Sequence, residues 1–528
     1  DTVRVHFFNQ LDDEYTGIHW HGIELANRSD GTQLVQNQVD PGESYIYEFT
    51  VTRPGIYWYH PHHHYSTNQV VKGLYGSLIV EDPNEDALVA NGTLPPPENT
   101  HTLLVGDMTI CKEPGSNDNV TYPNPGNTLP HVSGGTLPVQ GAPRPIDLCQ
   151  NSPFDKEGAP LGAPLPAGAI ANVQPQNQTV VNEGQTVVTN GVYVGGRSGN
   201  PRGGVALGAL DQNGKALDVT PGEGLRLQLI SPMQVRYLRF LLTLEDGRII
   251  PLVRIGGEGG LLNEAVLDGG TAAQTGFNWE YDQGQIVLGP SERADVVAAI
   301  PADATGVATL WTEDFGRLFG NPGYSGLPTV PVAHFNVTGE PPATPYTITG
   351  RASSEGGTVV TPGTPLRAQI PGQEIPFIEP SDLDGAVLNP ATLPLEADGS
   401  PKPGNASSTI TMNLFNINGV AGTHDLAGVD YTANPKENSA RYVRVGDTVE
   451  LQVSNPSALH HPFHMHGFSF QPVSLTSGGT TTTFPPEFVD SVDVPSGATL
   501  TYRFKAEERP QMDGVTPGGA LGRWVFHC

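Results

Sequence analysis

Pairs of histidines separated by one residue recur along this chain. HPFHMHG runs from His461 to Gly467, HWHG from His19 to Gly22 and HPH from His60 to His62, and the sequence ends on His527-Cys528. Imidazole and thiolate are ligands for transition metals. One extended strand that carries such a pair can serve two different metal ions. The spacing therefore indicates a site that holds more than one metal.

The segments around these histidines are repeated. DTVRVHFFNQ at Asp1 leads into HWHG, and DTVELQVSNP at Asp447 leads into HMHG. A third copy, PGEGLRLQLIS at Pro221, leads to RFLL at 239–242, where no histidine occupies the equivalent positions. The second halves repeat as well, with PGIYWYHPH, TGVATLWTE and GGALGRWVFHC. We expect three β-domains with one strand order, in which the outer two carry metal ligands and the middle one is a metal-free spacer.

Composition favours an all-β, loop-rich protein, because the chain has 64 Gly and 49 Pro and little amphipathic periodicity. The formal net charge is −28, which argues against nucleic acid and anionic membranes as partners. No apolar run approaches the roughly 20 residues of a membrane span. We expect a protein without nucleic-acid or membrane partners.

The domain boundaries follow from shifts in composition. We place domain 1 at residues 1–110, domain 2 at 181–338 and domain 3 at 346–528, with the linker GEPPATP before domain 3. Domain 1 would close with the strands GLYGSLIVED and HTLLVGDMT, and domain 3 would begin with the strand YTITG. A connection rich in Pro, Gly and Asn occupies 111–180, and its length suggests that it wraps a neighbouring domain.

Two of the three cysteines bracket this connection. We interpret Cys111 and Cys149 as a disulfide that closes a surface loop, and two free thiols are the alternative. A disulfide implies an oxidising compartment, so we expect a secreted or periplasmic protein. Asp1 begins inside what reads as a strand, which indicates an N-terminal truncation and leaves targeting undetermined.

The third cysteine decides the metal. A soft thiolate with imidazoles selects copper over magnesium or calcium, and one Cys with two His in a trigonal array is the blue-copper pattern. In order and separation, HWHG, HPH, HPFHMHG and His527-Cys528 resemble the motifs of three-domain multicopper oxidases of the laccase type. The resemblance extends through the repeat over nearly the whole chain. It implies three cupredoxin-like Greek-key β-sandwich domains and four coppers, namely one type 1, one type 2 and two type 3.

The resemblance also implies a role for each histidine in the motifs. His461 and Cys528 would bind the type 1 copper, which takes electrons from the substrate, and His19 and His464 would bind the type 2 copper. The coupled type 3 pair would be bound by His21, His60, His62, His466 and His527. Two further histidines and an axial residue are expected directly after Cys528, so we expect a C-terminal truncation as well.

Acidic residues near the motifs could supply protons. Asp30, in SDGTQ after HWHG, occupies the place where the family often has an acidic residue beside the trinuclear cluster. It is either a proton relay or a turn residue before Gly31, and the sequence leaves both readings open. We expect Glu487 and Asp490 to be solvated carboxylates at strand ends. The histidines next to the motifs that we expect not to bind metal are His63, His64 and His460.

The resemblance implies a monomeric oxidase that couples one-electron oxidation of phenols or aromatic amines to reduction of dioxygen to water. One alternative is an oxidase of Cu(I), Fe(II) or Mn(II) ions, and another is a non-catalytic copper-binding protein. The chain has five methionines and no Met-rich segment, which counts against a cuprous specialist because Cu(I) prefers thioether ligands. Ligands in both outer domains count against a simple carrier, which needs no dioxygen site.

The proposed disulfide is directly testable. Cys111 and Cys149 should resist alkylation in the unreduced protein and become reactive after reduction, as measured by mass spectrometry. In the chain-entropy view, closing this loop would stabilise the folded protein by about 3–4 kcal/mol. Two alkylated thiols without prior reduction would refute the pairing.

Overall fold

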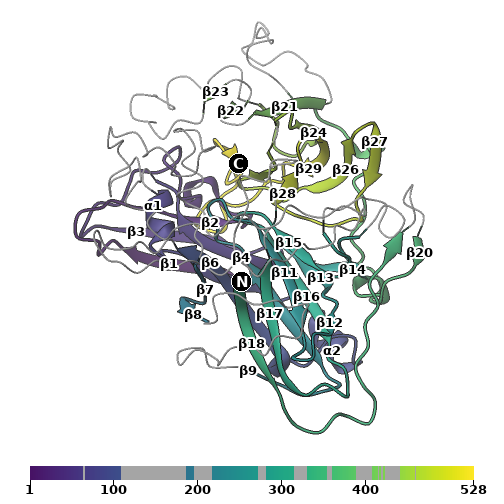
Figure 1. Ribbon diagram of the computed structural model, residues 1–528. Helices are drawn as coiled ribbons and strands as arrows, with labels where there is room; N and C mark the ends of the chain where they lie inside the picture. Colours follow the sequence, from purple (N-terminus) through teal and green to yellow (C-terminus); the bar gives the residue numbers. More distant parts are fainter. Residues whose placement is uncertain are drawn as a thin grey trace, which may run out of the picture.

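Strands dominate the protein in a computed structural model, which arranges them in three contiguous units, drawn in purple, teal and yellow-green in Figure 1. The residues that the structure describes are 1–63, 66–108, 186–194, 217–270, 281–313, 315, 330–353, 359–387, 407–413, 416–417, 420–421, 441–457 and 459–528. The chain is therefore all-β with the cupredoxin-like sandwich arrangement that the sequence predicts.

The first unit packs a two-stranded sheet against a three-stranded one. The sheets contain β1 (Thr2–Phe8) and β3 (Ser44–Thr50), and β2 (Ile18–His21), β4 (Gly55–Pro61) and β5 (Gly76–Val80). Two short helices follow, α1 (Ser66–Val71) and α2 (Glu85–Ala90). Trp20, Phe49 and Tyr57 are buried between the two sheets. The aromatic residue between the histidines of HWHG is thus a core residue, which leaves the two histidines on the opposite face.

The middle unit contains the two largest facing sheets. The first sheet contains, in chain order, β6 (Thr100–Met108), β7 (Thr186–Thr189), β8 (Val192–Tyr193), β10 (Gly224–Ile230), β13 (Val253–Gly257), β14 (Gly260–Val266) and β16 (Arg293–Ala299). The second contains β9 (Leu217–Val219), β11 (Leu238–Thr243), β12 (Ile249–Ile250), β15 (Ile286–Leu288), β17 (Gly306–Glu313) and β18 (Val330–Val337).

The third unit repeats the sandwich. Its larger sheet contains β21 (Ser407–Asn413), β22 (Asn416–Ile417), β23 (Val420–Ala421), β24 (Thr448–Ser454), β26 (Gln471–Ser477), β27 (Thr480–Thr483) and β29 (Thr499–Lys505). Its smaller sheet contains β25 (His461–Met465), β28 (Ser491–Val494) and β30 (Phe526–His527). A separate hairpin joins β19 (Ala352–Ser353) to β20 (Val359–Thr361).

Strand pairing follows the sequence repeat. The first repeated segment forms β1, β10 and β24, and these pair antiparallel with β3, β16 and β29 in the three units. The segment at the motif positions forms β2, β11 and β25, and these pair antiparallel with β4, β17 and β30. The same strand order therefore occurs three times, with histidines on β2 and β25 and none on β11.

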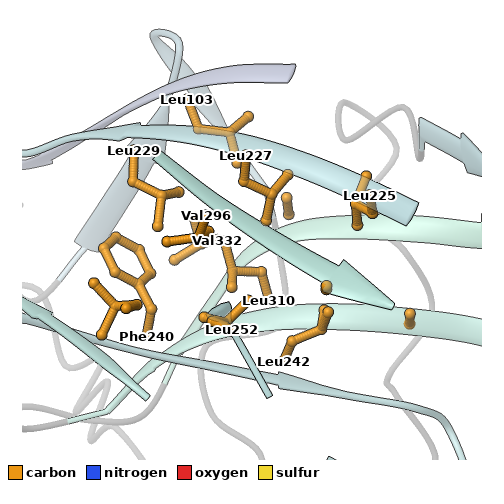
Figure 2. Close-up of a cluster of buried hydrophobic side chains, with 14 of the residues drawn as sticks. Leu103, Leu225, Leu227, Leu229, Phe240, Leu242, Leu252, Val296, Leu310 and Val332 are labelled. Atoms are coloured by element: carbon orange, nitrogen blue, oxygen red, sulfur yellow. The ribbon is translucent and has the colours of Figure 1, made fainter. Parts of the chain in front are cut away.

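The core of the middle unit includes the strand equivalent to the histidine strands of the outer units. Leu227 and Leu229 of β10 face Phe240 and Leu242 of β11 between the two sheets, and Figure 2 shows this packing. All four side chains have no exposed surface, so burial drives the packing. Leu242 lies opposite Leu310 as Trp20 lies opposite Tyr59, so Phe240 and Leu242 correspond to core residues of the outer units. The histidine positions correspond to Leu241 and Thr243, which carry no imidazole.

Two segments differ from the sequence-based expectation. HTLLVGDM, expected in domain 1, forms β6, which pairs in parallel with β10 of the middle unit. Apolar alternation predicts that this segment is a strand but not which sheet it joins. YTITG, expected to be the first strand of domain 3, is irregular, and Tyr346 and Ile348 pack against Leu94 and Val253.

Cys111, Cys149 and the whole connection 111–180 lie outside the described residues. Among the residues that the structure does describe, no helix has the length and apolar character to cross a membrane.

The buried core at β11 predicts a stability effect. Phe240→Ala should lower the free energy of unfolding by about 3–5 kcal/mol, because it removes a fully buried ring and leaves a cavity between two sheets. Denaturant unfolding would measure the loss. The matched control is Phe8→Ala, at a site that is 55% exposed, where a loss of roughly 0.5 kcal/mol or less is expected. Equal losses in the two variants would contradict this account of the core.

Candidate metal centre

Two asparagines fix the loops that lead into the histidine strands. Asn9, after β1, donates from Nδ2 to Glu14 O at 2.8 Å and to Val39 O at 2.9 Å. Asn455, after β24, donates to Leu459 O at 2.6 Å and to Val494 O at 2.8 Å. Both side chains also accept a backbone N–H from two residues ahead, at 3.0 Å. The repeated asparagine thus closes the same turn in both outer units, and β2 and β25 begin from equivalent positions.

Strand register brings the motifs together within each unit. His19 on β2 lies opposite His60 on β4, and His464 on β25 lies opposite His527 on β30. The alternation of β2 turns Trp20 into the core and both flanking histidines to the other face. Met465 is likewise buried in the core of the third unit. Each outer unit therefore presents its histidines on one face.

The two histidine faces pack directly on each other. The rings of His21 and His464 stack with centroids 3.7 Å apart, and those of His19 and His466 stack at 3.9 Å. Each stack joins one ring from the first unit to one from the third. The structure brings together all seven histidines predicted for the type 2 and type 3 sites, namely His19, His21, His60, His62, His464, His466 and His527.

The nitrogen positions fit metal binding. His527 Nε2 lies 3.3 Å from His62 Nε2 and 3.0 Å from His466 Nε2. Two imidazoles that share a tetrahedral metal with bonds of about 2.0–2.1 Å have nitrogens about 3.3 Å apart. A second set of His19, His21 and His464 also offers nitrogens within 4.8 Å of one another. Both sets therefore have donor spacing that a metal ion could bridge.

Two ring nitrogens without hydrogen-bond partners in the described structure also indicate a metal site. His19 Nε2 and His464 Nε2 are buried and have no hydrogen-bond partner among the described residues. Buried polar atoms are rarely left without a partner, since the loss of hydration is costly. A metal at the point where these lone pairs converge would satisfy both. His21 Nδ1 lies 3.3 Å from His60 Nε2, which gives a third close pair.

Burial keeps the rings in the form that binds metal. It lowers the pKa of His60, His62 and His466 well below the ordinary value, and the neighbouring imidazoles lower it further. Burial lowers the pKa of His527 to about 3. Neutral imidazoles have a lone pair for a metal, whereas imidazolium has none.

Two aspartates accept the ring N–H groups of four of these histidines, and each aspartate serves both outer units. His19 Nδ1 donates to Asp30 O at 2.7 Å, and His466 Nδ1 donates to Asp30 Oδ2 at 3.1 Å. His464 Nδ1 donates to Asp490 O at 2.9 Å, and His21 Nε2 donates to Asp490 Oδ1 at 3.0 Å. The carbonyl of each aspartate holds a histidine of its own unit, and its carboxylate holds one of the other unit. The nitrogen left without a proton on each ring points toward the cluster.

The surroundings of Asp30 fit both interpretations of its sequence, namely a turn residue before Gly31 and a group beside the histidine cluster. It precedes Gly31, whose φ of 80° suits a residue without a side chain, and a Cβ there would collide with Ile18 O. Its carboxylate accepts from His466 and from Thr32 Oγ1 at 3.2 Å, and Asp30 is 1% exposed. Turn position and contact with a histidine are therefore compatible.

The expectation that Glu487 and Asp490 are solvated is wrong. Asp490 is 1% exposed and Glu487 is 7% exposed. Arg293 donates to both oxygens of Asp490, and Arg254 Nη1 donates to Glu487 Oε2 at 2.6 Å. Burial alone would raise the pKa of Asp490, but the Arg293 guanidinium outweighs it and holds that pKa well below its usual range. Arginines from the middle unit make these burials possible.

The predicted type 1 residues also meet. His461 Nδ1 lies 3.4 Å from Cys528 Sγ, and His461 Nε2 lies 3.0 Å from Ser457 Oγ. His461 is 7% exposed and Cys528 is exposed. Because Cys528 follows His527 in the chain, backbone bonds connect this thiol–imidazole pair to the histidine cluster.

Other histidines have contacts of a different kind. His460 donates from Nδ1 to Asp493 Oδ2 at 2.7 Å, and His334 Nδ1 lies 2.9 Å from Thr309 Oγ1 in the middle unit. His63 is buried, and burial lowers its pKa to about 4. None of these three falls in a potential metal-binding group within the described part of the chain. His64 lies outside the described residues.

Sequence reasoning missed the middle unit's contribution to this site. Arg293 and Glu258 lie on segments without any metal-ligand motif, yet both contact the Asp490 segment. The sequence offered one signal, which is the group of charged residues Glu292, Arg293 and Asp295 at the start of an otherwise apolar strand.

The lowered histidine pKa values predict how the metal-free protein responds to acid. Unfolded histidines titrate near pH 6.5, whereas His62 and His466 stay neutral in the fold to well below that value. As pH falls below about 6.5, the unfolded state gains protons that the folded state does not, so stability decreases. Each histidine contributes at most about 1.4 kcal/mol per pH unit to this slope.

Urea unfolding of the metal-free protein between pH 7 and pH 5 would measure the slope. The variant with His62→Gln and His466→Gln should show a shallower decrease than the parent, because neither glutamine titrates. Parallel pH profiles for parent and variant would show that these histidines are not held neutral.

The segments that carry the histidine motifs are similar in sequence to one known family. Models of the multicopper oxidase family match residues 1–85 and 405–528. The chain is 42% identical over 85 residues to multicopper oxidase MmcO of Mycobacterium tuberculosis, a match that covers 16% of each protein. It is 46% identical over 84 residues to L-ascorbate oxidase of Nicotiana tabacum, covering 15% of this chain and 14% of the relative.

Solved structures with the same fold cover nearly the whole chain. McoA multicopper oxidase from Aquifex aeolicus, as its 2F4 variant, superposes with a TM-score of 0.55 at 21% identity, over 96% of this chain and 80% of that one. A multicopper oxidase from Campylobacter jejuni superposes with a TM-score of 0.52 at 16% identity, over 100% of this chain and 79% of that one. Both histidine-bearing segments therefore match the multicopper oxidase family, and the fold is the one seen in solved multicopper oxidases.

Proposed function

We propose that the protein is a laccase-like oxidase, which couples one-electron oxidation of phenols or aromatic amines to the four-electron reduction of dioxygen. One observation carries the proposal. A buried cluster of seven imidazoles from two units is joined by one backbone bond to a thiol–imidazole pair. A copper-storage protein would need no such connection between a thiol and a buried cluster.

The residues divide between two proposed sites as the sequence motifs imply. His461 and Cys528 would hold type 1 copper, and His19 and His464 would hold type 2 copper. The type 3 pair would be held by His21, His60, His62, His466 and His527. Copper, when bound at these sites, would supply the one-electron redox steps that link four donor molecules to one dioxygen.

The chain's own groups determine how electrons enter and where protons are held. Electrons would enter at the proposed type 1 site of His461 and Cys528, and the backbone bond from Cys528 to His527 would give them a short covalent path inward. Each phenol that loses an electron also releases a proton, and reduction of dioxygen to two waters consumes four electrons and four protons. Asp30, with its carboxylate on His466 Nδ1, is the group we propose as the proton relay.

The preference for organic donors over metal ions is also part of the proposal. Relatives include Laccase-2 of Cryptococcus neoformans, 42% identical over 93 residues, and iron transport multicopper oxidase fetC of Epichloe festucae, 41% identical over 86. Each match covers 14% or less of the relative, so neither decides the substrate. The absence of a Met-rich segment disfavours a cuprous oxidase. We further propose a monomer in a secreted or periplasmic location, on the basis of the predicted disulfide.

Substitutions at the two sites should have opposite effects in the full-length protein. Cys528→Ser should abolish the blue absorption and phenol oxidation, while the fold and most of the histidine-bound copper remain. His21→Ala should keep the blue colour and stop dioxygen consumption, because its ring belongs to the cluster alone. Absorption spectra, copper content and an oxygen electrode would measure these outcomes.

His334→Ala is the matched control, since it removes a buried histidine of the middle unit that is hydrogen-bonded to Thr309. It should keep both the colour and oxygen consumption. Phenol oxidation near the parent rate in Cys528→Ser, or normal respiration in His21→Ala, would refute the division into two sites. Faster turnover of Fe(II) or Mn(II) than of phenols by the parent would support the metal-ion alternative instead.

A further inference from the structure

Arg293 joins all three units at a buried point. It begins β16 of the middle unit, and its side chain has no exposed surface. Its Nε donates to Ile56 O on β4 of the first unit at 2.7 Å. Its Nη1 donates to Asp490 Oδ1 of the third unit at 2.8 Å, and Nη2 donates to Asp490 Oδ2. The guanidinium therefore grips the Asp490 carboxylate with two parallel hydrogen bonds, the geometry in which arginine is most specific.

The Asp490 carboxylate in turn contacts two rings of the histidine cluster. Its Oδ1 lies 3.0 Å from His21 Nε2 and 3.2 Å from His464 Nδ1. These two rings form the tighter of the two stacks between the units. One carboxylate oxygen thus accepts the N–H of His21 and lies beside the N–H of His464, which donates to the Asp490 carbonyl at 2.9 Å. The opposite nitrogens, His21 Nδ1 and His464 Nε2, are the ones turned to the cluster.

Glu258, in the turn between β13 and β14, holds the backbone on either side of this pair. Its Oε2 accepts Asp490 N at 2.7 Å and Ser491 N at 2.8 Å, and its Oε1 accepts Arg293 N at 3.2 Å. The main-chain segments that carry the arginine and the aspartate are therefore tied to one carboxylate. The middle unit supplies both the guanidinium and this tie.

Gly22, the last residue of HWHG, leaves room for the pair. A Cβ at Gly22 would lie 2.6 Å from Arg293 Nη2 and even closer to Asp490 Oδ2, which no real side chain could do. Gly22 also has a φ of 85°, a conformation that residues with a side chain rarely adopt. The motif that carries His19 and His21 is therefore shaped to admit the arginine–aspartate pair next to its second histidine.

The other aspartate lacks this support. The Asp30 carboxylate accepts from His466 and Thr32, and no lysine or arginine pairs with it among the residues the structure describes. The arginine is thus specific to the end of the cluster that holds His21 and His464. A general requirement for buried charge compensation would have placed a cation at both aspartates.

We propose that Arg293 is a positioning residue for the copper cluster, which acts by fixing the Asp490 carboxylate and through it the orientation of His21 and His464. The proposal rests on the proposed function, because it assumes that these rings bind copper. According to this proposal, the middle unit contributes no metal ligand but determines how tightly the outer units hold the metal. Loss of an outer hydrogen-bond partner of a metal-binding histidine typically weakens metal affinity about 10- to 100-fold.

A second buried arginine provides a matched control. Arg226 lies on β10, which pairs with β16, and is 4% exposed. It donates from Nε to Asp295 at 2.9 Å and from Nη1 to Glu85 of α2 at 2.6 Å, so it too joins the middle unit to the first. No histidine of the cluster is among its hydrogen-bond partners in the described structure. Removing either arginine costs a buried ion pair, but only one of the two contacts the cluster through an aspartate.

The experiment compares Arg293→Met, Arg293→Lys and Arg226→Met in the full-length copper-loaded protein. Copper retained per chain during titration with a chelator measures affinity, and electron paramagnetic resonance of the oxidised protein reports the type 2 copper environment. The blue absorption of the His461–Cys528 site is the internal reference. Arg293→Met should lose cluster copper at about 10- to 100-fold lower chelator concentration and show an altered type 2 signal, with the blue absorption kept. Arg226→Met should match the parent in copper retention and signal, although its melting temperature also falls.

Arg293→Lys keeps the charge without the two parallel hydrogen bonds, so it should show an intermediate loss of cluster copper. If Arg293→Met does not fold, Arg293→Lys is the variant that tests the proposal. Copper retention within twofold of the parent and an unchanged type 2 signal in the folded Arg293 variant would overturn the proposal. Equal loss of copper in Arg226→Met would overturn it as well, because the effect would then be one of general stability. If the parent itself bound no copper, the proposed function and this inference would both fail, whereas a copper-loaded parent with an indifferent Arg293 variant would refute only the inference.

Discussion

The structure depends on one constraint, which is that seven imidazoles must remain neutral and correctly turned in a place from which water is largely excluded. A neutral imidazole has one N–H and one lone pair, and a metal can use only the lone pair. Every N–H must therefore find an acceptor on the side away from the cluster. Burial favours the neutral form, as the lowered pKa values of His60, His62 and His466 indicate. The positions of the acceptors then decide which nitrogen each ring offers.

Asp30 and Asp490 supply such acceptors, and each accepts ring N–H groups from both outer units. Each uses its carbonyl for a histidine of its own unit and its carboxylate for a histidine of the other. Since neither unit contains both acceptors, neither can orient its own rings fully. His21 illustrates the result, because it offers Nδ1 where most of its neighbours offer Nε2, and the reason is the carboxylate of Asp490 on its Nε2. The site is a property of the assembled chain.

Much of the strand arrangement and of the histidine cluster could be predicted from the sequence, and the features that could not be predicted have identifiable physical reasons. HWHG and HMHG predict which histidines are ligands, because the motifs are local, and the repeat predicts their strand pairing because its copies align. The burial of Asp490 could not be predicted, since it depends on Arg293, which lies 197 residues away in the chain. The placement of β6 was missed for a similar reason. Its apolar pattern is equally suited to either sheet, and the parallel pairing with β10 is a tertiary choice.

The middle unit shows how a repeat can lose a ligand and gain another function. At β11 the positions equivalent to the histidines are Leu241 and Thr243, and Phe240 and Leu242 between and beside them stabilise its core. At β16 the same unit buries a guanidinium, which is costly unless the charge is compensated and the N–H groups are all satisfied. Ser291 and Glu258 of the middle unit contact the guanidinium, but Asp490 of the third unit and Ile56 of the first accept its other N–H groups, so the arginine is fully satisfied only when all three units are docked. Docking of the units and orientation of the cluster are therefore one event, because the contact that fastens the units together is also the contact that turns His21 and His464 inward.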